Sequence, residues 1–431
     1  MSGRKKYVKV VVLGDIGRSP RMQYHCKSLT EMGHQVDIIG YGDTEPMESV
    51  KTDPLILYHY MCPVPQFPMR LLNYAFKTIF QSLNLLFLLS ITSKSDILVM
   101  QNPPAIPAVI ICWFYTRLVG AKFIIDWHNY AHTIMALNVG TSHPLVKVTK
   151  KVEAIFGKKA DHNFCVTKAM KDDLCKQYGI EATTLYDRPP LMFKSITLED
   201  KHKFLLHCGQ TYHKVFLGEN DETTAFTEVA DGVVSLKPKR PGLLVSSTSW
   251  TEDEDFSVLL TVLQDYERQC QNGNPRQLPE LICAITGKGP LKEYYLHKLS
   301  KLSWNFVTII TPWLEPEDYP LLLASADLGV SLHTSSSGLD LPMKVVDMFG
   351  CGLPVCAFNF KCLDELVKHG ENSFVFSTPQ ELSKLLLDWF ENYPNNDKQQ
   401  HIESKFKTEL KTFQNLRWQE NWRLVAGPIF E

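Results

Sequence analysis

The stretch 327–358 constrains the fold of this chain more than any other part of the sequence. It begins with an apolar run, passes through the small residues 334–338, and ends in a second apolar run at 354–358. Between the two runs lies a short helix, for which we expect Asp340 as the N-cap and Pro342 in the first turn. A strand, a turn, a helix and a second strand in this order predict a βαβ unit of a parallel sheet.

The turn and the helix of this unit also carry candidate binding residues. The residues of the turn are Ser335, Ser336, Ser337 and Gly338. A turn of small residues at a helix N-terminus aims backbone N–H groups at an anion, typically phosphate. Lys344 and Asp347 share one helix face, and they predict a cation for a diphosphate and a carboxylate for ribose hydroxyls. The residues alone leave open an ordinary surface pair beside an exposed loop.

A second βαβ pattern opens the chain. An apolar run at 9–14 is followed by a glycine-containing loop, a helix at 22–32 and a strand at 35–40. Loops at the carboxyl ends of parallel strands hold ligands in open α/β sheets. The residues of this loop that we single out are Gly14, Asp15, Gly17 and Arg18. The glycines would admit close approach of a ligand, although two glycines with this spacing often only form a tight turn.

Polar residues follow another predicted strand, at 122–125. Asp126, His128 and Asn129 therefore belong to the same edge of the sheet as the loop after the first strand. His128 and Asp126 supply a base and a carboxylate. The alternative is a structural histidine with an aromatic neighbour.

The second half of the chain adds two further loops. Gly287 and Lys288 follow a predicted strand at 281–286, and they form a glycine turn that suits phosphate. The acidic run 252–255 precedes a helix at 256–270, and we expect it to cap that helix rather than to bind a metal.

Size and composition predict several domains. A chain of 431 residues is long enough for two or three of them. We expect an N-terminal domain at 1–190, a polar, irregular insert and linker at 191–240, a second domain at 241–415, and a C-terminal helix at 416–431 that packs back toward the first domain. The formal net charge of −2 gives no reason to expect nucleic acid. Eleven cysteines without a CxxC pair favour reduced thiols over disulfides or zinc.

Residues 69–91 are strongly apolar and carry a polar stripe at helical spacing. No uninterrupted apolar stretch reaches the ~20 residues that a membrane span needs. We favour a core helix of the first domain for this segment and keep a membrane-surface helix as the alternative. The apolar run 108–115 is a second candidate for the membrane surface.

Several motifs together resemble one family. The segments are GDIGRSPRMQYH, QNPPAIP, IIDWHNY, LLVSSTSWTEDEDF, ITGKGPLKEYY and HTSSSGLDLPMKVVDMFG. They are similar to GT-B-type glycosyltransferases, and among these to the mannosyltransferases that act on dolichyl-diphosphate chitobiose. The resemblance is weakest at 195–240. It implies an α/β fold of two doubly wound, Rossmann-like parallel-sheet domains that face each other across a cleft. It also implies that the domain at 1–190 takes the acceptor and that the domain at 241–415 binds the GDP-sugar donor.

The resemblance also implies the reaction, the partners and the location. It implies inverting transfer of mannose from GDP-mannose to dolichyl-diphosphate chitobiose, which forms the first β-linked mannose of the lipid-linked N-glycan precursor. The implied location is the cytosolic face of the endoplasmic reticulum membrane, together with other mannosyltransferases of the same pathway. Relatives begin with an anchor helix, whereas this chain starts close to its first strand. We therefore expect other surfaces to attach it, or a truncated or anchorless form.

Inversion requires a base for the acceptor hydroxyl and groups that stabilise the departing GDP. We expect either His128 or Asp15 as the base and favour His128, because an ion pair with Arg18 would weaken Asp15. Cationic side chains on the diphosphate make a required metal unnecessary, and the sequence leaves room for stimulation by Mg²⁺. Two alternatives are a GT-B transferase for another nucleotide sugar and a catalytically silent sugar-nucleotide or lipid-binding scaffold.

Overall fold

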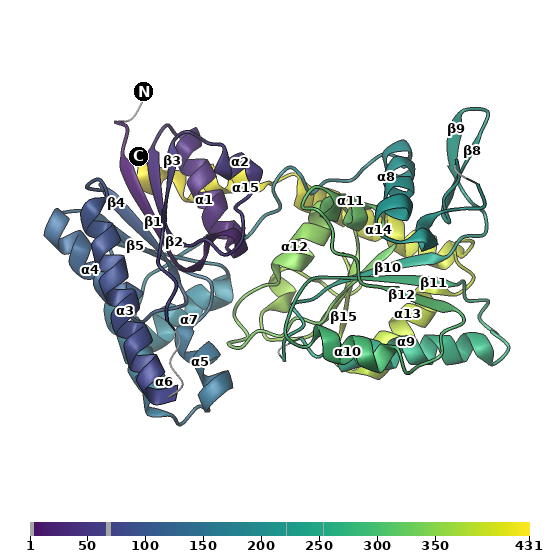
Figure 1. The fold of residues 1–431 in the computed structure, drawn as a ribbon. Coiled ribbons are helices and arrows are strands. Elements are labelled where there is room, and N and C mark those ends of the chain that lie inside the picture. Colours follow the sequence, from purple (N-terminus) through teal and green to yellow (C-terminus); the bar gives the residue numbers. More distant parts are fainter. Residues whose placement is uncertain (1–3, 66–69, 221, 253) are drawn as a thin grey trace. The chain divides into compact units, whose positions relative to one another are not determined.

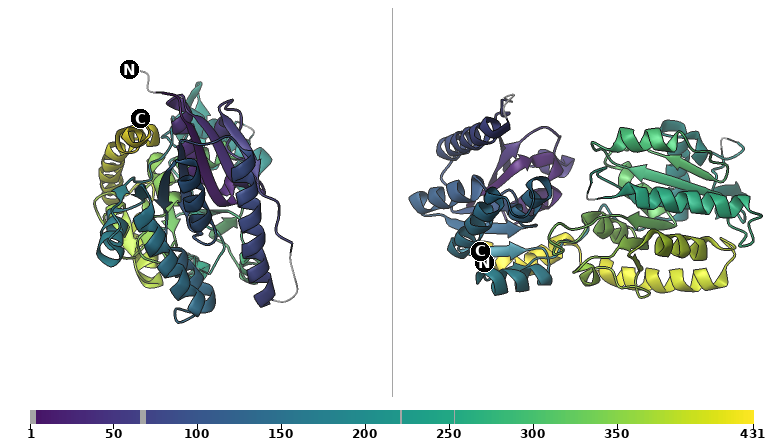
Figure 2. Two further views of the ribbon diagram at one scale, coloured as in Figure 1. Left: turned by 90° about the vertical axis from the view of Figure 1, so that its left-hand side faces the viewer. Right: turned by 90° about the horizontal axis from the view of Figure 1, so that it is seen from below.

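The computed structural model describes residues 4–65, 70–220, 222–252 and 254–431, and the chain divides into two compact units (Figure 1). Unit 1 comprises Met1–Asp187, Ser336–Asp340 and Trp418–Glu431. Unit 2 comprises Arg188–Ser335 and Leu341–Arg417. Each unit is built on a parallel sheet with helices packed around it, which confirms the predicted α/β class (Figure 2).

The sheet of unit 1 has seven parallel strands in the order β3-β2-β1-β4-β5-β6-β7. Its strands are β1 (Tyr7–Asp15), β2 (Gln35–Tyr41), β3 (Ile56–Tyr60), β4 (Ile97–Asn102), β5 (Lys122–Trp127), β6 (His162–Cys165) and β7 (Thr183–Thr184). β1 pairs with β2 on one side and with β4 on the other, so the strand order reverses at β1. Ligands of open α/β sheets bind outside the carboxyl ends of the strands near such a reversal. The loops after β1 and β5 belong to this edge.

Helices from both ends of the chain cover the sheet of unit 1. They are η1 (Ile16–Arg18), α1 (Pro20–Glu31), α2 (Glu48–Lys51), α3 (Arg70–Ile91), α4 (Ala108–Val119), α5 (Ala131–Val139), α6 (Pro144–Lys159), α7 (Lys168–Tyr178), α15 (Trp418–Val425) and α16 (Gly427–Phe430). The C-terminal segment joins unit 1 through two tryptophans, Trp418 and Trp422, each only 1% exposed. Trp418 packs against Tyr24 of α1 with a ring-centroid distance of 5.5 Å. Burial of two indoles fixes this segment on α1.

The sheet of unit 2 has six parallel strands in the order β12-β11-β10-β13-β14-β15. Its strands are β10 (Gly242–Ser247), β11 (Leu281–Thr286), β12 (Val307–Ile310), β13 (Leu328–Ser331), β14 (Val355–Phe358) and β15 (Phe374–Phe376). Its helices are α8 (Leu198–Thr211), η2 (Lys214–Phe216), α9 (Phe256–Gln271), α10 (Lys292–Leu299), α11 (Asp318–Ser325), α12 (Met343–Gly350), η3 (Leu363–Glu365), α13 (Pro379–Phe390) and α14 (Asp397–Gln414). β10 and β11 are buried throughout, as expected for central parallel strands.

The segment predicted as an irregular insert is ordered, so that expectation was wrong. It contains α8 and an antiparallel hairpin of β8 (Thr227–Ala230) and β9 (Val233–Leu236). Phe204, Leu205 and Cys208 of α8 are buried in a core of unit 2. Their spacing is helical, but polar neighbours dilute the pattern, and burial against the sheet decides the structure. A usable signal was the cap, since the Thr197 side chain accepts a hydrogen bond from the backbone N–H of Asp200.

Candidate active site

The favoured base lies in a buried polar cluster at the carboxyl end of β5. Asp126 is fully buried, whereas the side chain of His128 is 22% exposed. His128 Nε2 lies 2.8 Å from Asp126 Oδ2. An ionised carboxylate only accepts hydrogen bonds, so Nε2 of the neutral imidazole carries the proton and Nδ1 is left as the basic nitrogen. The pair therefore orients His128 and fixes its tautomer.

Asp126 also binds two side chains of α1. Arg21 donates from Nε to Asp126 Oδ2 at 2.8 Å and from Nη2 to Oδ1 at 2.9 Å. His25 Nε2 lies 3.1 Å from Asp126 Oδ2. Burial by itself raises the pKa of the Asp126 carboxyl, but Arg21 and His128 outweigh burial and hold that pKa well below its usual range. Asp126 therefore stays ionised and anchors His128 instead of contacting a substrate.

The C-terminal segment completes this cluster. Trp422 Nε1 donates to His25 Nδ1 at 2.9 Å, so the buried His25 is neutral, with its proton on the nitrogen that faces Asp126. Burial lowers the pKa of His25, which agrees with this assignment. Arg21 and His25 were not among the residues predicted from the sequence. Their separation of four residues on the helix after the first loop was the available signal, since it places both on one face.

The loop that carries His128 is held at its other end by a buried carboxylate. Glu153 of α6, 2% exposed, accepts hydrogen bonds from the backbone N–H of Ala131 at 2.7 Å and from Asn102 Nδ2 at 2.9 Å. His132 Nδ1 lies 2.6 Å from the other oxygen of Glu153. Glu153 was also missed, because the acid lies on a helix more than twenty residues beyond the loop.

Asp15, the other candidate base, is the N-cap of η1. Its Oδ1 accepts hydrogen bonds from the backbone N–H groups of Gly17 at 3.2 Å and Thr44 at 3.1 Å. Arg18 Nε lies 3.5 Å from the second oxygen, and the Arg18 side chain is 74% exposed. A Cβ at Gly17 would collide with the carbonyl oxygen of Thr44, whereas one at Gly14 would meet only ordinary contacts. The close approach at Gly17 is therefore to the chain's own backbone.

The small-residue turn is divided between the units, and residues 336–340 belong to unit 1. Asn129 Nδ2 donates to Asp340 Oδ1 at 2.8 Å and to Ser336 Oγ at 3.2 Å. The backbone N–H of Leu339 donates to Ser337 Oγ at 3.2 Å, and Gly338 has a left-handed φ of 71°. Asp340 is not the N-cap of α12, because that helix begins at Met343 with Pro342 at the cap position. Asp340 instead accepts from Asn129.

Lys344 lies in the first turn of α12 and forms an ion pair with Glu254. Glu254 is 3% exposed and also accepts a hydrogen bond from Thr248 Oγ1 at 2.8 Å. Lys344 Nζ donates to Ser249 Oγ at 3.1 Å. Within the acidic run, Asp255 caps α9 as predicted, by accepting from the backbone N–H of Ser257. Glu254 does not cap; it holds Lys344 at the sheet edge.

The glycine turn after β11 lies against the loop after β10. A Cβ at Gly287 would collide with the carbonyl oxygen of Thr248, and Gly287 has a φ of 118° that favours glycine. The Lys288 ammonium lies 3.5 Å from the centroid of the Trp313 ring, and Trp313 is 55% exposed. Asp347 is half-buried, one turn after Lys344. In unit 2, cations and N–H-bearing turns therefore meet at the carboxyl ends of β10, β11 and β13.

Comparisons with known proteins show which family the chain belongs to. Residues 21–186 match the family described as Glycosyltransferase Family 4, and residues 231–407 match Glycosyl transferases group 1. The chain is 46% identical to a chitobiosyldiphosphodolichol β-mannosyltransferase of Pongo abelii, over 98% of this chain and 92% of that protein. The chain belongs to the chitobiosyldiphosphodolichol β-mannosyltransferase family. It is also 42% identical to the UDP-glycosyltransferase TURAN of Arabidopsis thaliana, over 99% of this chain and 97% of that protein.

Solved structures support the fold of this family member. The chain resembles the crystal structure of Anabaena HepE in complex with UDP-glucose, with a TM-score of 0.65 and 13% identity over 99% of each chain. At this identity the likeness shows the shared fold alone. Together with the family descriptions, it confirms the predicted GT-B glycosyltransferase.

Helix α3 of this β-mannosyltransferase family member has two different faces. Leu85, Leu88 and Leu89 are buried in the core of unit 1, as a core helix requires. On the other face, Leu83 is 63% exposed and Phe87 is 61% exposed. No helix in the described part of the chain is long and apolar enough to cross a membrane. Among the described residues, no group of three or more His, Cys, Asp or Glu side chains is placed to hold a metal ion.

Proposed function

We propose that this chain transfers mannose from GDP-mannose to dolichyl-diphosphate chitobiose, with inversion at the anomeric carbon. The observation that carries the proposal is the similarity to chitobiosyldiphosphodolichol β-mannosyltransferases over 98% of the chain. The oriented pair of Asp126 and His128 supports it, because a silent binding scaffold has no need for a basic nitrogen held in one tautomer.

In this reaction, unit 1 takes the acceptor and provides the base. His128 Nδ1 removes the proton of the acceptor hydroxyl while that oxygen attacks the anomeric carbon and the bond to GDP breaks. Asp126 stabilises the imidazolium that forms, because its charge is close and water is excluded around it. Arg21 neutralises part of that charge, so Asp126 acts mainly by orientation.

Unit 2 binds GDP-mannose through its carboxyl-edge loops. Lys344 and Lys288 stabilise the charge that develops on the diphosphate, and Asp347 holds the ribose hydroxyls. Glu254 keeps Lys344 extended toward the site before the donor arrives, which limits the entropy lost on binding. Because cationic side chains neutralise the leaving group, we propose that no metal is required. Full activity in EDTA, with or without added Mg²⁺, is the expected result.

A donor competition assay tests the proposed reaction. The purified chain receives a short-chain lipid-diphosphate chitobiose acceptor with GDP-mannose, GDP-glucose or UDP-glucose, and product linkage is determined by NMR. We expect a β-linked mannose from GDP-mannose alone. The UDP-glucose arm is included because the Arabidopsis relative is named a UDP-glycosyltransferase. Transfer from UDP-glucose in preference to GDP-mannose would refute the donor assignment, and no transfer from any donor would favour the scaffold.

We further propose that unit 1 binds the cytosolic face of the endoplasmic reticulum membrane through the outer face of α3. The acceptor is anchored by a lipid, so the acceptor unit has to approach the bilayer. Exposed Leu83 and Phe87 provide apolar surface, and Phe114 and Leu118 of the neighbouring α4 are 54% and 86% exposed. An interfacial helix buries such a face among the lipid headgroups.

Charge substitutions on α3 test this attachment. Leu83→Glu/Phe87→Glu should release the protein from liposomes that contain anionic lipid, while a water-soluble acceptor is still mannosylated. The matched control is Val233→Glu in β9 of unit 2, where the native side chain is 66% exposed. A double variant that stays folded and still floats with liposomes would refute the role of α3.

A further inference from the structure

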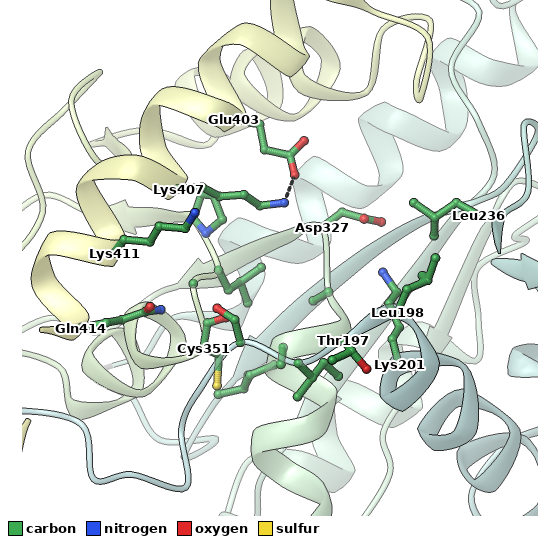
Figure 3. A pocket seen from close by; sticks show the side chains of 18 of the residues that line it. Thr197, Leu198, Lys201, Leu236, Asp327, Cys351, Glu403, Lys407, Lys411 and Gln414 are labelled. Atoms are coloured by element: carbon green, nitrogen blue, oxygen red, sulfur yellow. Dashed lines mark hydrogen bonds and ion pairs between the residues drawn. The ribbon is translucent and has the colours of Figure 1, made fainter. Parts of the chain in front are cut away.

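A cavity lies in unit 2, at the edge of the sheet opposite to the donor-binding loops (Figure 3). Asp327, which immediately precedes β13, and Pro354, which immediately precedes β14, both line it. Parallel strands have their amino ends on one edge and their carboxyl ends on the other. This cavity is therefore separate from the loops that carry Lys344 and Lys288. Its volume is about 370 Å³, within the range of small-molecule sites.

The side chains of the cavity carry an excess of positive charge. The ionisable lining residues are Lys201, Arg240, Lys407, Lys411, Asp327 and Glu403. Four cations and two carboxylates give a formal charge of +2. Figure 3 shows Lys201 from α8 and Lys407 from α14 entering the cavity from opposite sides.

The two carboxylates already have partners within the protein. Asp327 Oδ2 accepts from the backbone N–H of Leu243 at 2.8 Å. Glu403 pairs with Lys407 across one helical turn at 2.5 Å. Both acids therefore have partners within the protein, and cationic side chains outnumber carboxylates in the cavity lining.

Lys201 and Arg240 are incompletely satisfied. In the described part of the chain, the Lys201 ammonium makes no hydrogen bond or ion pair. Burial lowers the pKa of Lys201, and the nearby charge of Asp327 opposes this only in part. Arg240 donates from Nη2 to the Tyr393 hydroxyl at 2.7 Å, but its buried Nε has no partner among the described residues. The buried Arg240 Nε without an acceptor is costly, and the half-buried Lys201 ammonium beside it has no hydrogen-bond partner among the described residues, so the two side chains favour an anion in the cavity.

We propose that this cavity binds a small phosphate monoester at a site distinct from the GDP-mannose site. A phosphate monoester carries a charge of about −1.5 to −2 at neutral pH and three acceptor oxygens, which match the excess of +2 and the unsatisfied donors. Leu198, Leu323 and Leu353 line the rest of the cavity and suit a carbon skeleton. A neutral apolar ligand would leave the buried Arg240 Nε without an acceptor, and a cation would meet like charge.

Calorimetric titration of the whole chain tests the site independently of transfer. Saturating GDP first occupies the donor loops, and the probes are then glycerol 3-phosphate, inorganic phosphate and sodium chloride at equal ionic strength. We expect saturable binding of glycerol 3-phosphate and weaker binding of inorganic phosphate. Lys201→Met should weaken binding at least tenfold, and the exposed Lys411→Met severalfold.

Lys384→Met on α13 is the matched control, because Lys384 is exposed and does not line the cavity. It should leave binding unchanged, and all three variants should keep wild-type transfer in the absence of phosphate. Absence of saturable heat in the wild type would overturn the proposal. Equal binding in the wild type, Lys201→Met and Lys411→Met would place any bound phosphate elsewhere and overturn it as well.

Discussion

Replacement of His128 by alanine tests the central mechanistic assignment. The variant loses the hydrogen bond of 2.8 Å between the imidazole and Asp126. Asp126 keeps both bonds from Arg21 and the contact with His25, so its charge stays compensated. We expect a loss of free energy of unfolding of only about 1–2 kcal/mol, the net value of one such bond. The protein should therefore remain folded for assay.

The kinetic loss should be much larger than the loss of stability. A positioned general base contributes about 100- to 10,000-fold to the rate, or about 3–5 kcal/mol of transition-state stabilisation. Since the base acts in the transition state, kcat should fall by that factor while KM for GDP-mannose changes less than about threefold. Added imidazole should restore part of the activity.

Asp15→Asn is the matched control. An amide oxygen can still accept from the backbone N–H groups of Gly17 and Thr44, so the loop keeps its shape and only the charge is lost. We expect kcat within about tenfold of wild type, because we assign Asp15 the role of a helix cap and not that of the base. An inactive Asp15→Asn together with an active His128→Ala would refute our reasoning and make Asp15 the base.

Three further predictions concern donor binding and stability. Lys344→Met should destabilise unit 2 by about 3–5 kcal/mol in denaturant unfolding, since buried Glu254 loses its counter-charge. Lys344→Met/Glu254→Gln should recover that stability yet bind GDP-mannose about 30- to 150-fold more weakly, and wild-type affinity in this double variant would disprove the donor role. Asp347→Ala should weaken GDP but not 2′,3′-dideoxy-GDP in calorimetry; equal weakening of both would exclude a ribose contact. Burial lowers the pKa of His25 below 6.5, so the unfolded state binds more protons under that pH. The free energy of unfolding should then fall as pH drops below about 6.5, by at most about 1.4 kcal/mol per pH unit, and an unchanged pH dependence in His25→Asn would contradict this assignment.

Local patterns were sufficient for the strands and for the residues that follow them. The predicted strands at 9–14, 35–40, 122–125 and 281–286 correspond to β1, β2, β5 and β11. Fully buried parallel strands read as unbroken apolar runs, and parallel order puts the following loops at one edge. That is why Asp126 and His128 could be singled out without a structure.

Helix α3 was harder to predict, because its two faces meet different environments. Sequence favoured a core helix for the segment 69–91 and kept a membrane-surface helix as the alternative. The structure shows Leu88 buried and Phe87 exposed on adjacent positions of α3. The polar stripe marks this segment as a helix, but apolar residues lie on both sides of the stripe, so only packing shows which side contacts the core.

The sequence by itself determined the α/β class, the family resemblance and the sheet-edge position of His128. It also yielded Lys344 as a candidate cation, because helical spacing and turn composition are local properties. Only the tertiary structure showed the partners of these residues. Arg21 and His25 bind Asp126, and Glu254 forms an ion pair with Lys344. Such pairs join residues about ninety to one hundred positions apart in the chain. Their free energy comes from burial and from satisfied charge, which exist only after the chain has brought those residues together.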